Sequence, residues 1–308
     1  MSQPKHTKKQ PGRPTLLRSL VTFAAIVAVV VGVGVGLSVL KRSDSSSASG
    51  VIRGLPRTPD YHSLLVSPTD PGRLVLGTHY GLFNSDDGGA SWRRTDFGRR
   101  DAMNLARTRA QSVVWAAGHK VLAKSTDGGK TWQDVSPPGL PYLDVHGFAA
   151  DPRDADTLYA AIASNGLYRS TNGGDSFSLV THEVGGDVFA LAITRDGRVL
   201  AGDTRRGLLS SGDGGRTWST VFGSPVIGLA VNPKRPQRIL ASGQITQLST
   251  DGGRHWKLVL ALNKGTGPVA WSPSAPATAY LVGFDRMLYR SSDGGENWQP
   301  VHAKAESK

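Results

Sequence analysis

The sequence contains no cysteine, which excludes disulfides, thiolate metal sites and cysteine nucleophiles. Such a composition fits an oxidising compartment, where free thiols are a liability. Glutamate is nearly as scarce, since only Glu183, Glu296 and Glu306 follow residue 50. The sequence also lacks a Ser-His-Asp motif, a phosphate loop and a dinucleotide fingerprint, and its glycines do not open a helix that would hold a phosphate. Cysteine-dependent enzymes, Ser-His-Asp hydrolases and enzymes that bind nucleotides through these motifs are therefore not expected.

Basic residues are in excess, with a formal net charge of +12, but the excess is uneven. Residues 1–50 carry half of it. A basic tail beside an apolar segment serves membrane topology and does not form a basic groove. Nucleic acid is therefore not an expected partner.

The apolar segment is residues 19–40, a run of 22 positions without a charge. A helix of this length spans about 30 Å of hydrocarbon. Five basic residues precede it and two follow it closely, which predicts a cytoplasmic N-terminus. We expect a cytoplasmic tail at 1–18, a single-pass signal anchor in the cell membrane at 19–40 and a polar linker at 41–57. The alternative is a cleaved signal peptide, since small residues surround Ala48 and Gly50.

An octapeptide of the form Ser-x-Asp-Gly-Gly-x-x-Trp recurs six times. Its third position is occupied in turn by Asp87, Asp127, Asn172, Asp213, Asp251 and Asp293. Its last position is occupied by Trp92, Trp132, Phe177, Trp218, Trp256 and Trp298. The copies are 38 to 45 residues apart, a period typical of propeller blades.

The octapeptide has a structural explanation. Gly-Gly supplies the positive φ angles of a tight hairpin, the Asp accepts hydrogen bonds from the turn, and the aromatic residue packs against its own sheet. The flanks complete a four-stranded unit, which in the first blade is expected at 63–67, 74–78, 81–84 and 92–95. The sequence thus predicts an all-β fold: a six-bladed β-propeller of four-stranded antiparallel blades at 58–303, preceded by one transmembrane helix and followed by a tail at 304–308. For ring closure two alternatives remain, a strand from 51–55 pairing with the sixth blade, or six blades that each supply their own four strands.

The octapeptides are identified as Asp-boxes, or BNR repeats, and this resemblance covers residues 58–301. The chain most resembles bacterial membrane-anchored BNR-repeat proteins loosely labelled glycosyl hydrolases, through DYHSLLVSPTDPGRLVLGTHYGLF and DVHGFAADP. Related propellers include sialidases, xyloglucanases, sortilin-type receptors and photosystem assembly factors. The chain lacks the Arg-Ile-Pro motif of sialidases and almost all the glutamates they need, so sialidase activity is not expected.

Candidate site residues lie where the inner strands begin, on the face opposite the Asp-boxes. Four carboxylates occupy matching positions before these strands: Asp60, Asp101, Asp144 and Asp187. Further candidates lie at the strand starts and in the loops of the same face: His62, His79, Met103, His119, His146, Asp203 and Asp285. The plainest interpretation is that the Asp residues end turns and the histidines cap strand ends.

Three functions follow from these residues. The first is a binding or scaffold module for an extracytoplasmic protein or glycan. The second is a glycoside hydrolase using two of the four carboxylates, which would lie about 5–10 Å apart. The third is a site for a divalent metal formed by His62, His79, His119 and His146, with copper also considered because of Met103. Whether the chain is an enzyme stays open at this point.

Overall fold

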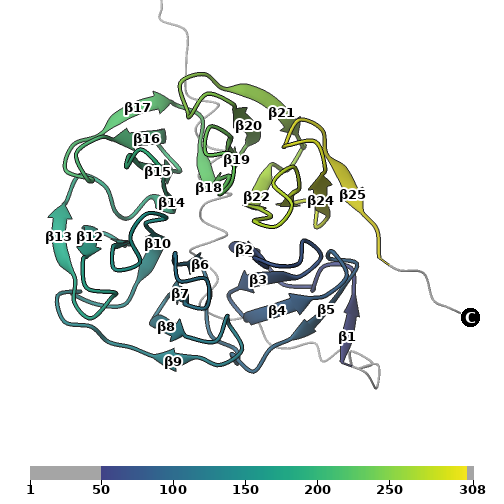
Figure 1. Cartoon of the computed structure of the whole chain (residues 1–308), viewed down its shortest axis with the longest axis horizontal. Helices are drawn as coiled ribbons and strands as arrows, with labels where there is room; N and C mark the ends of the chain where they lie inside the picture. Colours follow the sequence, from purple (N-terminus) through teal and green to yellow (C-terminus); the bar gives the residue numbers. More distant parts are fainter. Residues whose placement is uncertain (1–49, 304–308) are drawn as a thin grey trace, which may run out of the picture. The chain divides into compact units, whose positions relative to one another are not determined.

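The computed structural model describes residues 50–303, which form a ring of six blades around a central axis (Figure 1). The expected tail, anchor and C-terminal segment at 1–18, 19–40 and 304–308 lie outside these residues, as does most of the expected linker. Within residues 50–303 no helix is long and apolar enough to cross a membrane. The predicted six-bladed propeller of four-stranded antiparallel blades is confirmed.

Each blade runs outward from the centre of the ring in four antiparallel strands, and the sheet of the first blade carries a fifth strand on its outer edge. The inner strands are β2 (Ser63–Val66), β6 (Asn104–Arg107), β10 (Val145–Ala150), β14 (Val188–Ile193), β18 (Val226–Val231) and β22 (Thr266–Trp271). The second strands are β3 (Leu74–Thr78), β7 (Val114–Gly118), β11 (Leu158–Ile162), β15 (Val199–Asp203), β19 (Ile239–Gly243) and β23 (Ala279–Gly283).

The third strands are β4 (Gly81–Ser85), β8 (Val121–Ser125), β12 (Gly166–Ser170), β16 (Gly207–Ser211), β20 (Ile245–Ser249) and β24 (Leu288–Ser291). The outer strands are β5 (Ser91–Arg94), β9 (Gln133–Asp134), β13 (Ser178–Thr181), β17 (Ser219–Phe222), β21 (Lys257–Ala261) and β25 (Gln299–Val301). Strand β1 (Val51–Arg53) precedes them all. In the first blade the observed bounds differ from the expected ones by at most one residue.

The core lies between the blades, where the second strands are covered on both faces. Small residues allow neighbouring blades to approach closely, and Ala116, Ala160, Ala201 and Ala241 are at most 1% exposed. The outer strands carry exposed positions, as expected for the rim of the ring. No strand is shared between blades. Apolar packing between the sheets therefore holds the ring together.

The octapeptides form the turns between third and outer strands. In the first blade Asp87 accepts hydrogen bonds from the Ser91 amide at 2.8 Å and the Ser91 hydroxyl at 2.7 Å. Gly89 has a φ of +91°, and the Trp92 indole donates to its carbonyl at 3.0 Å. In the third blade Asn172 keeps one of these bonds through its amide oxygen and donates to the Ser176 hydroxyl.

The ring closes where the sixth blade meets the first. A shared apolar cluster joins Leu64, Leu76 and Trp92 to Tyr280 and Leu288. Strand β1 pairs with β5 on the outer edge of the first blade, so the alternative that paired this segment with the sixth blade is wrong. Ile52 of β1 and Leu55 just after it pack against the shared cluster. The two ends of the propeller meet here, since a methyl group on Gly54 would lie 3.7 Å from the Ala303 side chain.

Candidate functional site

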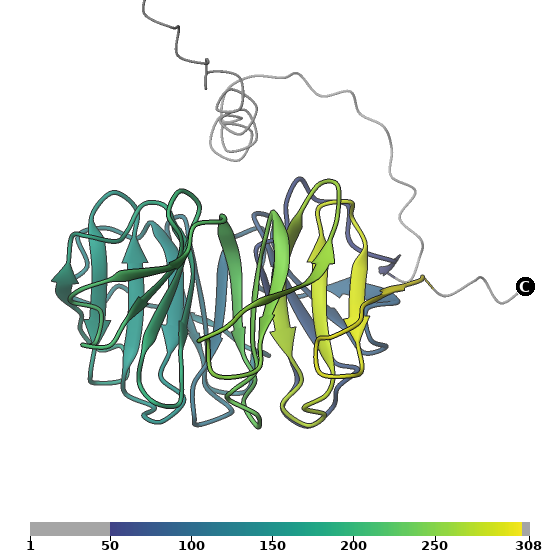
Figure 2. The same ribbon diagram turned by 90° about the horizontal axis from the view of Figure 1, so that it is seen from above.

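Histidine and aspartate side chains gather where the inner strands begin, on the face opposite the octapeptide turns. The strands run between the two faces of the ring (Figure 2), so residues before an inner strand and in the turn between the second and third strands share one face. We call this face the channel face. Seven of its side chains form a continuous series over the first three blades, here called the histidine–aspartate row: Asp60, His62, His79, Asp101, His119, Asp144 and His146.

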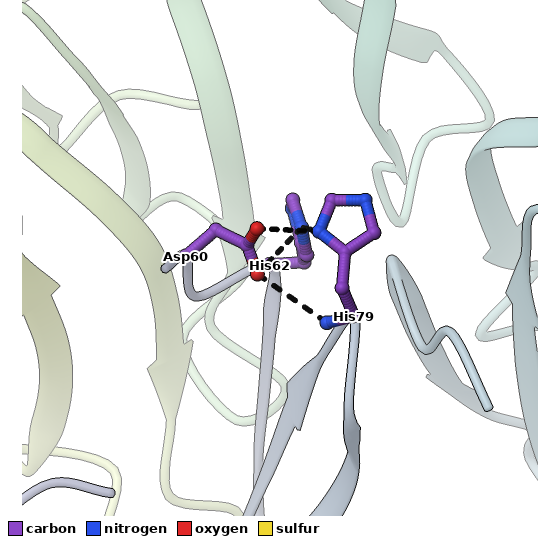
Figure 3. Close-up of side chains that lie close together, drawn as sticks. All are labelled: Asp60, His62 and His79. Carbon is purple, nitrogen blue, oxygen red and sulfur yellow. Dashed lines mark hydrogen bonds and ion pairs between the residues drawn. The ribbon is translucent and has the colours of Figure 1, made fainter. Parts of the chain in front are cut away.

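The row begins in the first blade at Asp60 (Figure 3). Its Oδ1 lies 3.1 Å from His62 Nε2 and its Oδ2 lies 2.5 Å from His79 Nδ1, while the two ring nitrogens are 2.7 Å apart. Burial raises the pKa of the Asp60 carboxyl, but hydrogen bonds from the two histidines outweigh it and hold the pKa well below the usual range. The bond with Asp60 raises the pKa of His79.

In the second blade Asp101 repeats this arrangement. It is 8% exposed, and its Oδ2 accepts from the His119 amide at 2.9 Å and from His119 Nδ1 at 2.6 Å. Burial raises the pKa of Asp101, but the bonds from His119 outweigh it and lower the pKa overall. The bond with Asp101 raises the pKa of His119. The His79 and His119 rings stack at 5.5 Å, which links the two blades.

In the third blade Asp144 lies between two histidines. Its Oδ1 is 3.5 Å from His119 Nε2 and 3.3 Å from His146 Nε2. This oxygen is shielded from solvent and accepts no hydrogen bond from the described residues. His146 Nδ1 donates to the Gly186 carbonyl at 3.1 Å, and burial lowers the pKa of this histidine.

The row ends at the fourth blade because the residue types change. Phe189 occupies the position of the blade-start histidine and stacks on His146 at 5.0 Å. Asp187 pairs with Arg205 at 3.2 Å, so the structure does not bring this fourth carboxylate into the row.

Three other candidates also lie outside the row. Asp203 is buried and caps its turn, accepting from the amides of Arg205 and Arg206 at 2.8 Å. Asp285 accepts from the Met287 amide and the Tyr289 hydroxyl, which is again a turn role. Met103 is 3% exposed, so its thioether is not presented on the surface.

Sequence reasoning missed the aromatic residues of the channel face. Among the described residues the exposed large aromatic side chains are Tyr80, Tyr142 and Phe284. Tyr80 and Phe284 lie in turns between second and third strands, and Tyr142 lies in the loop before β10. All three are therefore on the channel face. A large aromatic residue at a loop tip is a signal that the sequence alone contains.

The surface is also hollowed beside the row. A hollow of about 440 Å³ on the channel face is lined by residues that include His182, Gly186, Asp187 and Arg205. A second hollow of about 310 Å³ lies on the opposite face, beside the octapeptide of Asp251.

The model of one protein family, described as photosynthesis system II assembly factor YCF48, matches residues 62–299. The chain belongs to the YCF48 family. A curated relative, the photosystem II assembly lipoprotein Ycf48 of Synechococcus sp. (strain CC9902), is 25% identical over 303 residues, covering 92% of this chain and 87% of the relative. The resemblance to BNR-repeat propellers is thereby confirmed.

This YCF48-family chain is also similar to glycoside hydrolases. A xyloglucanase of Paenibacillus sp. is 28% identical over 245 residues, but the match covers 61% of this chain and only 24% of that enzyme. The solved GH74 xyloglucanase of Xanthomonas campestris has a TM-score of 0.58 at 19% identity, covering 80% of this chain and 45% of that one. A structure of YCF48 bound to D1 peptide has a TM-score of 0.52 at 20% identity, covering 81% and 84%. At these identities the structures show a shared fold.

Proposed function

We propose that this YCF48-family chain is a membrane-tethered, extracytoplasmic propeller that binds a segment of a partner protein on its channel face. The observation that carries the proposal is the placement of the exposed aromatic residues. Tyr80 and Tyr142 are each 45% exposed and Phe284 is 37% exposed, and all three lie on this face. Aromatic side chains contribute much of the contact area in protein interfaces, and exposing them costs hydration free energy in a free protein.

The polar groups between these aromatics suit the same role. The histidine–aspartate row and the neighbouring hollow supply donors and acceptors that fix the orientation of a bound chain. The YCF48 structure bound to D1 peptide supports a peptide as the ligand class, since that protein shares this fold and family. The partner of the present chain is proposed by class, as a protein segment.

Tethering rests on the apolar segment at 19–40 and its basic flanks. The Synechococcus relative is named a lipoprotein, which supports a membrane location for a propeller of this family. A reporter enzyme that folds only outside the cytoplasm, fused after residue 308, tests this topology. We expect reporter activity from the intact fusion. An intact fusion without activity, together with activity in a fusion that lacks residues 1–18, would contradict the proposed topology.

The hydrolase alternative receives less support from the site. A glycosidase needs one protonated carboxylic acid beside one carboxylate. The pKa values of Asp60 and Asp101 are both lowered by their histidine partners, so both groups are ionised near neutral pH. Asp60 and Asp101 therefore do not form the pair of one carboxylic acid and one carboxylate that a glycosidase uses.

Site-specific photocrosslinking tests the binding proposal. A photoreactive residue replaces Tyr80 or Tyr142 in the full chain, expressed in the cells that make it. A third variant carries it at His255, which has a 91% exposed side chain in an octapeptide turn on the opposite face. We expect one protein to be crosslinked from both channel-face positions and not from His255. Crosslinking that is absent, or equal from His255, would contradict the proposal.

A further inference from the structure

We propose that the third-blade end of the histidine–aspartate row is a binding site for a divalent transition-metal ion. The ligand atoms are His119 Nε2, His146 Nε2 and Asp144 Oδ1. This inference goes beyond partner binding and does not depend on it. The sequence predicts a metal site formed by four histidines. The structure reduces the proposed ligands to two of these histidines and one carboxylate.

The first argument is the spacing of the ligand atoms. Asp144 Oδ1 lies 3.5 Å from His119 Nε2 and 3.3 Å from His146 Nε2. An ion bound tetrahedrally at about 2.0–2.2 Å separates its ligand atoms by about 3.3–3.6 Å. The two distances from the Asp144 oxygen thus match the spacing that such an ion requires, and ligand atoms of all three residues lie within 4.8 Å of one another.

The second argument is the position of the protons. His146 Nδ1 faces the Gly186 carbonyl, which only accepts, so Nδ1 carries a proton. His119 Nδ1 donates to the ionised Asp101 in the same way. In each neutral ring the other nitrogen, Nε2, therefore presents a lone pair to Asp144 Oδ1. A cation at this point would be bound by the two ring nitrogens and the Asp144 oxygen together.

The third argument is the hydrogen bonding behind the ligands. Metal-binding histidines donate their remaining N–H to a carboxylate or a backbone carbonyl, which fixes the ring. Asp101 does this for His119, and Gly186 does it for His146. Both rings are thus oriented before any ion binds. The Asp144 oxygen is meanwhile shielded from water and has no hydrogen-bond donor among the described residues.

The other two clusters of the row are less suited to an ion. In the first, His79 Nδ1 lies 2.5 Å from Asp60 Oδ2 and 2.7 Å from His62 Nε2, distances at which a shared proton bridges the atoms. In the second, Asp101 Oδ2 already accepts two hydrogen bonds from His119. Protons take the place of a metal in both clusters.

The donor set is suited to Zn²⁺. Two imidazole nitrogens and one carboxylate oxygen are ligands that zinc accepts in sites that keep one open position. The Asp144 oxygen is shielded, but the His119 side chain is 44% exposed and the Asp144 side chain is 36% exposed, so the site lies at the surface of the channel face. A water molecule or a group from a bound partner would complete the coordination.

Zinc uptake by the purified full-length chain in detergent tests this proposal. The protein is stripped with a chelator and dialysed against Zn²⁺ alone, and bound metal is counted by elemental analysis. We expect one ion per chain. Asp144→Asn, His119→Gln and His146→Gln should each weaken binding by more than about 100-fold, because loss of a supporting group alone costs 10–100-fold.

Two variants serve as controls. His182→Gln removes an exposed histidine whose Nδ1 also bonds a backbone carbonyl, and His62→Gln alters the far end of the row. Both should keep the wild-type stoichiometry and affinity. Zn²⁺ should also raise the Tm of the wild type and not that of His119→Gln, which checks the result in a folded protein. A wild type that takes up no Zn²⁺, or uptake lost in His62→Gln and kept in His119→Gln, would overturn the proposal.

Discussion

Replacement of Trp92 by alanine tests whether the seam between the first and sixth blades governs stability. Trp92 is 1% exposed and its indole belongs to the apolar cluster that also holds Tyr280 and Leu288. Burial of about 150–250 Å² of aromatic surface at about 25 cal/mol per Å² amounts to roughly 4–6 kcal/mol. Measured Trp→Ala losses in cores are about 3–5 kcal/mol. We therefore expect a loss of about 4 kcal/mol.

Trp132 provides the matched control, because it has the same place in the second octapeptide. Its indole donates to the Gly129 carbonyl at 3.1 Å, much as Trp92 donates to Gly89 at 3.0 Å. Trp132 is only half-buried and meets Phe97 edge to face at 5.2 Å. Trp132→Ala loses the same hydrogen bond but less apolar contact, so we expect about half the destabilisation.

Equilibrium urea unfolding of the full-length variants measures both changes, and their difference isolates the seam. Equal losses in the two variants, or a larger loss in Trp132→Ala, would refute the conclusion that burial at the seam sets the difference.

Three further predictions concern the turns and the seam. Gly89→Ala should lower the Tm more than Gly129→Ala. Both glycines have a positive φ, but the methyl group on residue 89 would lie 2.0 Å from a leucine of the sixth blade. Equal Tm values would contradict this prediction. Asn172→Asp should raise the Tm at pH 7 and lose that gain progressively as the pH falls from about 4 to about 2. The pKa of the equivalent Asp293 is lowered to about 2 because hydrogen bonds from its turn outweigh burial, so the stabilisation is complete above the unfolded pKa and is lost as the pH falls through the folded pKa. Tyr280→Phe should lower the free energy of unfolding in urea by about 1 kcal/mol, because the Tyr280 hydroxyl donates to a carbonyl of the first blade at 3.0 Å. An unchanged midpoint would show that this hydrogen bond adds no net stability.

The blades were predictable from the sequence because their signals are local. Each octapeptide contains its own turn glycines, its Asp acceptor and its closing aromatic residue, so blade number and strand order follow without knowledge of distant contacts. The partner of β1 was not predictable in this way. The outer edge of the first blade and that of the sixth are alike in backbone, and only the structure shows that β1 pairs with β5 while Ile52 and Leu55 pack into a cluster formed by both blades.

The candidate site, too, was predictable from the sequence only in part. Matching the starts of the inner strands places His62 and His146 on one face, and the structure brings them into one row with His79 and His119. Aspartates at matching positions nevertheless differ in their partners, because a neighbouring loop offers His119 to Asp101 and Arg205 to Asp187. Such pairings depend on side-chain directions across a gap between loops, which spacing along the chain does not encode.

The meeting of Gly54 and Ala303 at the seam has a consequence for the order of the blades. Each blade is built from one continuous segment, and no strand crosses from one blade into another. A short peptide between these two ends would therefore turn the propeller into a closed loop of chain. That loop can be opened at another connection between blades, giving circular permutants in which any blade comes first. The blade that comes first along the chain is thus not determined by how the ring is built.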